Sequence, residues 1–290
     1  MENPAADLDF GKRTYVMGIL NVTPDSFSGD GLLSRENTVQ AALDQAQRFI
    51  DAGVDILDIG GESTRPGAVP VDEKDEMERV LPVITALRQA GISTLISIDT
   101  YKARVADAAL RHGANWINDV WALRADPQMA TVAAAHQATI ILMHNRSKPS
   151  HADLQQRLGG RYIGVAYVDL IGEVRQELMS SVQLARQAGI PDSKLILDPG
   201  IGFGKTVEQN LELVNRLEEI RALGFPVLVG ASRKSFIGYT LDLPPAERVE
   251  GTAAVCAIAI ARGADILRVH DVEVITRVAR MSDAIIRAGK

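Results

Sequence analysis

The stretch LILDPGIGFGKT, residues 195–206, joins a short apolar run to a turn rich in glycine and proline, and a segment with helical periodicity follows it. A strand buried on both faces reads as such a run, so we expect a strand over 195–198 that ends at Asp198. We expect Lys205 and Thr206 to begin the helix that follows.

The last letters of this stretch are similar to a phosphate-binding P-loop, G-x-x-x-x-G-K-[ST]. The first glycine of that pattern would fall at position 199, where the chain has Pro199. Proline lacks the N–H group that an anion-binding loop needs, and it fixes φ. The glycine spacing G-x-G-x-G also differs from the dinucleotide pattern G-x-G-x-x-G. We therefore interpret the stretch as a strand, a turn and a helix start, and not as a nucleotide site.

The same succession of strand, turn and helix recurs along the chain. The predicted strands are 15–20, 56–59, 94–98, 116–118, 139–143, 195–198, 226–229 and 266–269. The predicted helices are 39–52, 73–90, 102–111, 127–137, 171–188, 207–223, 245–261 and 271–288. This rhythm in 290 residues predicts a single-domain (β/α)8 TIM barrel, with an open parallel sheet as the alternative.

No linker divides the chain, so we expect an N-terminal tail over 1–13 and one barrel domain over 14–290. The longest irregular stretches are 23–37, 63–72 and 145–164. Loops of that length in a compact domain are typically functional, and we expect the first two, which follow the first and second strands, to act as lids.

Composition restricts the class of protein. The formal net charge of −6 argues against a nucleic-acid-binding surface. The single Cys256 lies in an apolar run, which indicates a buried thiol in a reducing compartment. No uninterrupted apolar stretch is long enough to span a membrane, and the acidic start of the chain is unlike a signal peptide. We expect a soluble cytoplasmic protein.

Strong polar residues follow every predicted strand. In a barrel they would all face the carboxyl-terminal mouth, where such enzymes keep their sites. Singly, each has a structural explanation: Asp119 and Asp271 fit turns or helix caps, Lys234 a solvated lysine and His144 a structural histidine. These explanations do not account for the whole set: Asn21, Asp58, Glu62, Thr64, Asp99, Asn118, Asp119, His144, Asp198, Ser232, Arg233, Lys234, Arg268, His270 and Asp271.

The residue types in this set indicate a ligand. Two carboxylates and an amide suit the edge of a flat heterocycle with several N–H donors, and Asp99, Asn118 and Asp198 provide them. Lys234, Arg268 and His270 suit an anion such as a phosphate or diphosphate. Asn21 offers one oxygen to Mg²⁺, which takes its other ligands from water and substrate phosphates. These residue types do not name the reaction.

Seven segments resemble the motifs of dihydropteroate synthases. They are MGILNVTPDSFS (17–28), DIGGESTRPGA (58–68), SIDT (97–100), IND (117–119), LDPGIGFGKT (197–206), LVGASRKSFIG (228–238) and RVHDV (268–272). The resemblance runs in order from about residue 14 to the last predicted helix. It implies a TIM-barrel transferase of folate biosynthesis, which joins 6-hydroxymethyl-7,8-dihydropterin diphosphate to 4-aminobenzoate and releases diphosphate and 7,8-dihydropteroate.

The resemblance also implies roles for single residues. It places the pterin against Asp99, Asn118, Asp198, Lys234, Met143 and Phe203, and the diphosphate against Thr64, Arg268 and His270. It places the aminobenzoate, with which sulfonamides compete in the family, near Phe203 and against Arg65, Pro66, Ser235 and Phe27. Asn21 would bind Mg²⁺, and the catalytic residues would be Lys234, Arg268, Asp99 and Asp30. In this arrangement the glycines of 195–206 would let the backbone pass close beneath the flat pterin.

The implied chemistry needs no strong base, because an aromatic amine is already a nucleophile. An SN1-like loss of diphosphate fits the cationic residues and Mg²⁺, and water must be excluded from the carbocation. Phe27 and Arg65 lie on the two predicted lids. The resemblance implies a homodimer, with which the apolar segment 253–260 is compatible.

Some positions depart from the family pattern. The first loop reads DSFSGDG where relatives have DSFSDGG, so Gly29 and Asp30 are exchanged. MHNR (143–146) replaces a longer stretch, and HADLQQRLGGRY (151–162) has no assignable role. A pterin-binding methyltransferase barrel and a non-catalytic relative are the alternatives; the S-R-K, R-V-H and E-S-T-R-P-G motifs favour the synthase over the first.

Overall fold

The structure is a computed structural model that describes residues 8–23, 35–64, 67–148, 152–155, 157–162 and 164–288. Four residues with predicted roles, Phe27, Asp30, Arg65 and Pro66, lie outside the described residues. Among the described residues no helix is long and apolar enough to cross a membrane.

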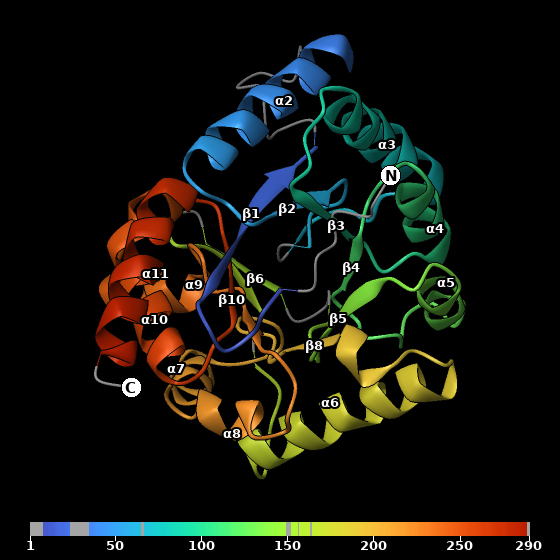
Figure 1. Cartoon of the computed structure of the whole chain (residues 1–290). Helices are drawn as coiled ribbons and strands as arrows, with labels where there is room; N and C mark the ends of the chain where they lie inside the picture. The colour runs from blue at the N-terminus through green and yellow to red at the C-terminus, as the bar shows by residue number, and fades with distance from the viewer. Residues whose placement is uncertain are drawn as a thin grey trace.

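Eight parallel strands form the centre of the molecule (Figure 1). They are β1 (Tyr15–Asn21), β2 (Ile56–Gly60), β3 (Leu95–Asp99), β4 (Trp116–Asp119), β5 (Thr139–Met143), β8 (Leu195–Asp198), β9 (Leu228–Val229) and β10 (Ile266–Val269). Their order is β8-β5-β4-β3-β2-β1-β10-β9, and a parallel bridge between Leu197 and Val227 joins the two ends. The predicted barrel is therefore confirmed, and the open sheet is wrong.

Helices surround the strands as an outer ring (Figure 1). They are α2 (Arg35–Asp51), α3 (Glu73–Gln89), α4 (Ala103–Arg111), α5 (Met129–Ala135), α6 (Leu170–Gln187), α7 (Val207–Asn215), α8 (Leu217–Arg221), α9 (Ser235–Leu241), α10 (Val249–Ala261) and α11 (Val272–Arg287), with short 3-10 turns η2 (Asp192–Lys194) and η3 (Pro245–Glu247). Most begin or end within a few residues of the predicted bounds.

Four predictions about these elements need correction. The helix predicted over 207–223 is broken at Arg216, whose φ of −110° and ψ of 25° leave the helical region. The segment 245–261 begins as the 3-10 turn η3, and α10 starts at Val249. The helix α9 was not predicted. The stretch 145–164, predicted as irregular, contains an antiparallel hairpin of β6 (Ala152–Gln155) and β7 (Gly159–Tyr162).

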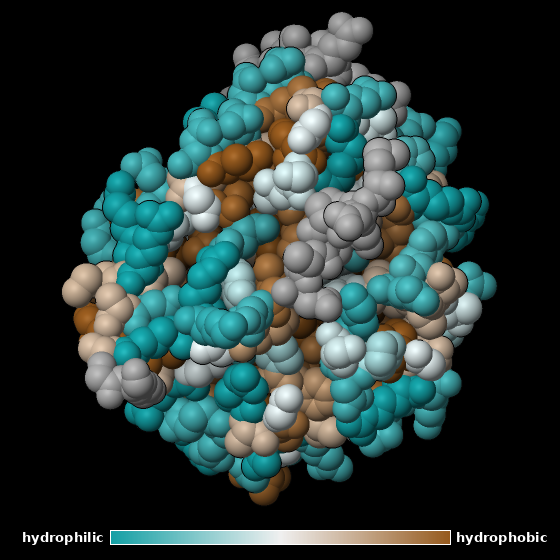
Figure 2. All heavy atoms as spheres, in the orientation of Figure 1, coloured by the Kyte–Doolittle hydropathy of each residue, from teal (hydrophilic) through white to brown (hydrophobic). Residues whose placement is uncertain are grey.

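The inward-facing residues of the barrel change in character along each strand. Side chains of a strand alternate between its two faces, so residues two apart share a face. At the amino-terminal ends the inward residues form an apolar cluster, made by Tyr15, Met17, Ile56, Leu95, Trp116, Ile141, Ile196, Leu228 and Ile266, with Leu8 and Phe10 packed against it. The outward residues of the strands join the larger core beneath the helices. Figure 2 shows hydrophobic residues towards the middle of one face of the molecule and hydrophilic residues over the helices around them.

Candidate functional site

A polar layer follows the apolar cluster inside the barrel. Counting two residues on from Ile56, Trp116, Ile196 and Ile266 gives Asp58, Asn118, Asp198 and Arg268, and counting four on from Leu95 gives Asp99. All except Arg268 are at most 9% exposed. The same alternation that fills the lower barrel with apolar side chains therefore brings charged groups together at the carboxyl ends of the strands.

Arg268 lies between two buried carboxylates. Its Nε donates to Asp58 Oδ2 and its Nη2 donates to Asp99 Oδ2, while Asn118 Nδ2 donates to Asp58 Oδ2 at 3.1 Å. Burial raises the pKa of Asp99 to about 7, and the charge of Arg268 opposes that rise. Burial acts to lower the pKa of Arg268, but the two carboxylates hold it above its usual range. Arg268 therefore bridges two carboxylates, and these two bonds hold its guanidinium in one orientation.

Asp58 was expected at the mouth of the barrel, but no ligand or catalytic role was predicted for it. The signal that finds it is its place two residues after the inward Ile56, on the same face of β2. It supports both Arg268 and Asn118, so it orients two residues with predicted ligand roles.

Lys234 and Asp198 lie together on the other side of the mouth. Lys234 Nζ donates to the carbonyl of Ile201 and lies 4.5 Å from the centre of the Phe203 ring. Burial lowers the pKa of Lys234 to about 8, and the charge of Asp198 works against that. Asp198 accepts from the Gly200 N–H at 2.7 Å, and burial raises the pKa of this carboxyl. The solvated-lysine interpretation of Lys234 is therefore wrong.

The turn after β8 needs glycine because its backbone packs closely against neighbouring groups. Gly200 and Gly204 have φ of +71° and +68°, and a Cβ at these positions would overlap the backbone of His144 and Arg146. A Cβ at Gly202 would press on the Lys234 side chain. Passage beneath a flat ligand stays a prediction, whereas these contacts show that the turn already packs against the loop after β5.

The prediction that Lys205 begins the helix is wrong, because α7 starts at Val207 and the Lys205 side chain points into the protein. Its Nζ donates to the carbonyls of Gly200 at 2.9 Å and Phe203 at 3.1 Å, and it lies 3.0 Å from His144 Nδ1. Burial lowers the pKa of Lys205 to about 7. Thr206 is the N-cap of α7, with a capping box to Gln209. Lys205 therefore stabilises the turn through these bonds. In a P-loop the lysine at this position would instead bind phosphate.

The structure also tests the structural explanations considered for His144, Asp119 and Asp271. His144 is buried with Nε2 3.1 Å from Glu177 Oε2, and burial lowers its pKa to about 4, so the structural interpretation is confirmed. Asp119 accepts from the N–H groups of Trp121 and Leu123, as a turn former does. Asp271 precedes α11 without a side-chain cap bond and pairs instead with Arg233.

A cavity of about 500 Å³ opens over the polar layer. Of the predicted site residues it is lined by Asn21, Thr64, Asp99, Phe203, Lys234, Ser235, Arg268 and His270. Asn118, Asp198 and Met143 do not line it; they are 3–4% exposed and lie buried in the barrel. His270 Nδ1 lies 3.0 Å from Ser232 Oγ, a contact that orients the ring.

The loop that carries Thr64 is fixed by an ion-pair cluster that was not predicted. Glu62 lines the cavity and pairs with Lys102, which also pairs with the buried Glu76 of α3. The Tyr101 hydroxyl donates to Glu62 Oε1 at 3.0 Å. The loop after β2 therefore rests on groups from α3 and from the loop after β3.

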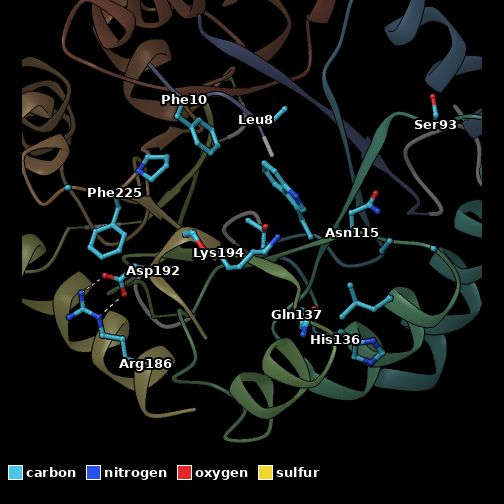
Figure 3. A pocket seen from close by; sticks show the side chains of 18 of the residues that line it. Leu8, Phe10, Ser93, Asn115, His136, Gln137, Arg186, Asp192, Lys194 and Phe225 are labelled. Carbon is cyan, nitrogen blue, oxygen red and sulfur yellow. Dashed lines mark hydrogen bonds and ion pairs between the residues drawn. The ribbon is translucent and has the colours of Figure 1, made fainter. Parts of the chain in front are cut away.

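A larger cavity, of about 900 Å³, lies at the opposite end of the barrel (Figure 3). Leu8, Phe10, Asn115 and Phe225 line it, and dashed lines in Figure 3 mark the pair of Arg186 with Asp192. It is next to the amino ends of the strands, the end that serves stability in TIM barrels. We therefore place the site at the smaller cavity, where the buried charges converge.

Residues 17–270 match the family described as pterin binding enzyme. The dihydropteroate synthase of Synechocystis sp. is 52% identical over 280 residues, which cover 96% of this chain and 92% of the relative. The Xanthomonas albilineans dihydropteroate synthase solved with 4-aminobenzoic acid has a TM-score of 0.85 at 40% identity, with 95% and 94% of the two chains covered. The Yersinia pestis enzyme in a sulfonamide drug complex has a TM-score of 0.84 at 40% identity, with 95% of each chain covered.

Proposed function

The chain belongs to the pterin binding enzyme family, and within it to the dihydropteroate synthases, and from this premise we propose how its mouth carries out the reaction. The reaction joins 6-hydroxymethyl-7,8-dihydropterin diphosphate to 4-aminobenzoate and gives 7,8-dihydropteroate and diphosphate. The observation that carries the proposal is the convergence of Asp99, Lys234 and Arg268 on one cavity above the buried Asp58 and Asp198.

The pterin edge binds to the buried acceptors. Asp99 and Asp198 accept from the N–H donors of the aminated ring, Asn118 adds an amide, and Lys234 donates to a ring acceptor. Since burial makes unpaired charge costly, each carboxylate gains from a donor brought by the ligand. A ring that reaches Asn118, Asp198 and Met143 enters deeper than the cavity that the structure shows, so we propose that the side chains above them shift when it binds.

The diphosphate binds at the rim, against Thr64, Arg268 and His270. Arg268 keeps its guanidinium fixed on Asp58 and Asp99, which reduces the ordering needed when an anion arrives. Asn21 at the end of β1 lines the same cavity and suits Mg²⁺, which binds through few protein oxygens and completes its shell with phosphates and water. Bound there, the ion would neutralise charge on the leaving diphosphate.

Bond cleavage releases the diphosphate with the electron pair of the methylene C–O bond. The positive charge left on the methylene carbon is delocalised into the pterin ring, and the amine nitrogen of 4-aminobenzoate then attacks that carbon and loses a proton. Arg268 and His270 stabilise the leaving charge, while Phe203 and Ser235 border the space for the amine. The predicted lids with Phe27, Arg65 and Pro66, and the predicted role of Asp30, stay predictions.

The methyltransferase alternative is less well supported. Such a domain needs pterin-edge carboxylates but not the anion-binding groups of the S-R-K and R-V-H motifs. Here Lys234, Ser235, Arg268 and His270 all line one cavity, as a diphosphate substrate and an aromatic amine together require.

Release of diphosphate from the pterin diphosphate tests the function. We expect release and product formation that depend on both 4-aminobenzoate and Mg²⁺. A protein that binds the pterin diphosphate by calorimetry but releases no diphosphate would be the non-catalytic relative, and the exchange at Gly29 and Asp30 would be the first position to restore.

We also propose a homodimer and a cytoplasmic location. Ile258 on α10 and Met281 and Ile285 on α11 are 48–63% exposed, and these two helices pack side by side, which gives a partner copy an apolar surface. Sedimentation at micromolar concentration tests the dimer; a monomer there would contradict it. The buried free Cys256 suits a reducing compartment.

A further inference from the structure

The hairpin β6–β7 forms one wall of the functional cavity, although its sequence had no assignable role. Gly159, Gly160 and Tyr162 line the cavity together with Phe203 and Ser235. Gly159 also packs against Pro245 of η3, since an added Cβ would lie 3.3 Å from Pro245 Cγ. The hairpin and η3 therefore pack against each other where both line the cavity.

A buried arginine fixes this wall to the loop that carries the lysine of the site. Arg248 is 2% exposed, and its guanidinium donates to the carbonyls of Leu158 at 2.8 Å, Arg233 at 2.9 Å and Leu243 at 3.0 Å. Leu158 belongs to the turn of the hairpin, and Arg233 precedes Lys234. The distance between the hairpin and Lys234 is thus set by one rigid planar group.

Tyr162 connects the hairpin to two segments of the site. Its ring lies 6.2 Å from the Phe203 ring, at 30° between the planes, and Lys234 Nζ lies over the other ring of this pair. Its hydroxyl donates to the carbonyl of Thr64 at 3.3 Å. Burial raises the pKa of Tyr162, so the hydroxyl keeps its proton at neutral pH.

We propose that Tyr162 is a specificity-determining and positioning residue for the aromatic amine. Its ring is the outer wall against which the amine packs, and its hydroxyl holds the Thr64 segment at the right distance from Phe203. The inference rests on the proposed function, because it takes the amine to be the second substrate. A third ring stacked between two others needs roughly 7 Å, so the 6.2 Å pair bounds the amine from one side and does not sandwich it.

Two substitutions separate the parts of this role. Tyr162→Ala removes the wall, and we expect the KM for 4-aminobenzoate to rise about tenfold, the size of one aromatic contact, with the KM for the pterin diphosphate within about twofold. Tyr162→Phe keeps the wall and loses the bond to Thr64, so we expect an amine KM within about threefold of the wild type and a lower kcat. Arg157→Ala is the matched control: it lies in the same hairpin and pairs with Asp242 outside the cavity, and we expect no change.

A second amine tests specificity directly. In Tyr162→Ala we expect kcat/KM for 4-aminobenzoyl-glutamate, which is bulkier, to improve about tenfold relative to 4-aminobenzoate, because a wall is gone. A merely structural tyrosine would lower both values in proportion. An unchanged ratio, an amine KM within twofold of wild type, or an equal rise in both KM values would overturn the proposal.

Binding keeps this test apart from the proposed function. Calorimetry of 4-aminobenzoate on the wild type and on Tyr162→Ala, each loaded with pterin diphosphate and without turnover in the absence of Mg²⁺, should show about tenfold weaker binding to the variant. A wild type that binds both substrates but never turns over would sink the synthase activity, while the ratio of the two affinities would still decide the role of Tyr162.

Discussion

The two ends of the barrel both carry cavities, but Arg88 at the amino end and Arg268 at the carboxyl end bind different kinds of group. At the amino end, Arg88 donates to the carbonyls of Gly113, Ile92 and Thr94 and to Asn115 Oδ1, at 2.6–2.9 Å. These acceptors are neutral, and the guanidinium joins loops that would otherwise leave half-buried carbonyls unpaired. At the carboxyl end, charged groups face one another, as Arg268 does with Asp58 and Asp99.

The difference shows how one fold separates stability from chemistry. Arg88 uses four of its five N–H groups on neutral acceptors, which leaves little of its guanidinium for a ligand. A set of charges that are buried together keeps shifted pKa values and can exchange its partners for a substrate. Cavity volume does not distinguish the ends, since the larger cavity is at the structural one.

Arg268→Ala should give the largest effect and sharpen the contrast most. It removes the anion-binding guanidinium and the partner of two acids, so we expect kcat/KM to fall about 10³-fold in a steady-state assay of diphosphate release. Arg262→Ala, which removes an exposed pair with Glu218, is the control and should leave the rate unchanged. Activity within tenfold of the wild type would move the anion site elsewhere.

Asp198→Asn comes next. It keeps the shape of the side chain but removes the buried acceptor charge, so we expect pterin binding by calorimetry to weaken about 100-fold. Because a buried charge is lost, the melting temperature should hold or rise. Retained affinity would make Asp198 a structural residue of the turn, like the charges of the amino end.

The pH profile of kcat/KM should show both site charges at once. The pKa of Asp99 is raised to about 7, so the accepting carboxylate is lost as the pH falls through 7. The pKa of Lys234 is lowered to about 8, so the donating ammonium is lost as the pH rises through 8. We expect a narrow bell with its maximum between these values, and Lys234→Arg should remove the alkaline limb. A flat profile from pH 6 to 9 would exclude both groups.

The smallest effect on activity should come from the amino end. Arg88→Met leaves three carbonyls without this donor, while Asn115 Oδ1 keeps the Ile96 N–H, so we expect a loss of about 2–4 kcal/mol in the free energy of unfolding, measured in urea, with kcat/KM within about twofold. Arg104→Met, at a side chain that is 73% exposed, should change neither quantity. A large drop in kcat/KM for Arg88→Met would break the division between the two ends.

The sequence predicts the barrel well because its strands are buried on both faces and read as continuous apolar runs. It predicts the polar layer at the carboxyl ends of the strands for the same reason, since Asp99, Asp198 and Arg268 fall where those runs end. The break at Arg216 escapes it because the buried Leu213, Leu217 and Ile220 keep helical spacing across the break. The hairpin β6–β7 escapes it because both strands have four residues, and β7 is half-buried throughout, without a buried face that sets a clear alternation.

The inward direction of Lys205 is not visible in its sequence either. A lysine before a helix is usually solvated. Here the folded turn itself gives its ammonium two carbonyl acceptors, and His144 approaches it from the end of β5. Asp58 is a different case, because simple alternation on β2 already places it inside the barrel.

The seam between β8 and β9 has a mechanical consequence. β9 has two residues, and β8 meets this part of the chain through the bridge of Leu197 with Val227 and the bond from Leu197 N–H to the Pro226 carbonyl at 2.9 Å. This is the shortest strand pairing in the barrel, and Asp198 ends one of the two strands while Lys234 follows the other. A pterin bound to both residues would connect β8 to β9 across this pairing. Because a ligand that binds the native state raises its stability, the pterin would stabilise the closed barrel. Resistance to heat and to proteases would then rise with the concentration of the pterin substrate.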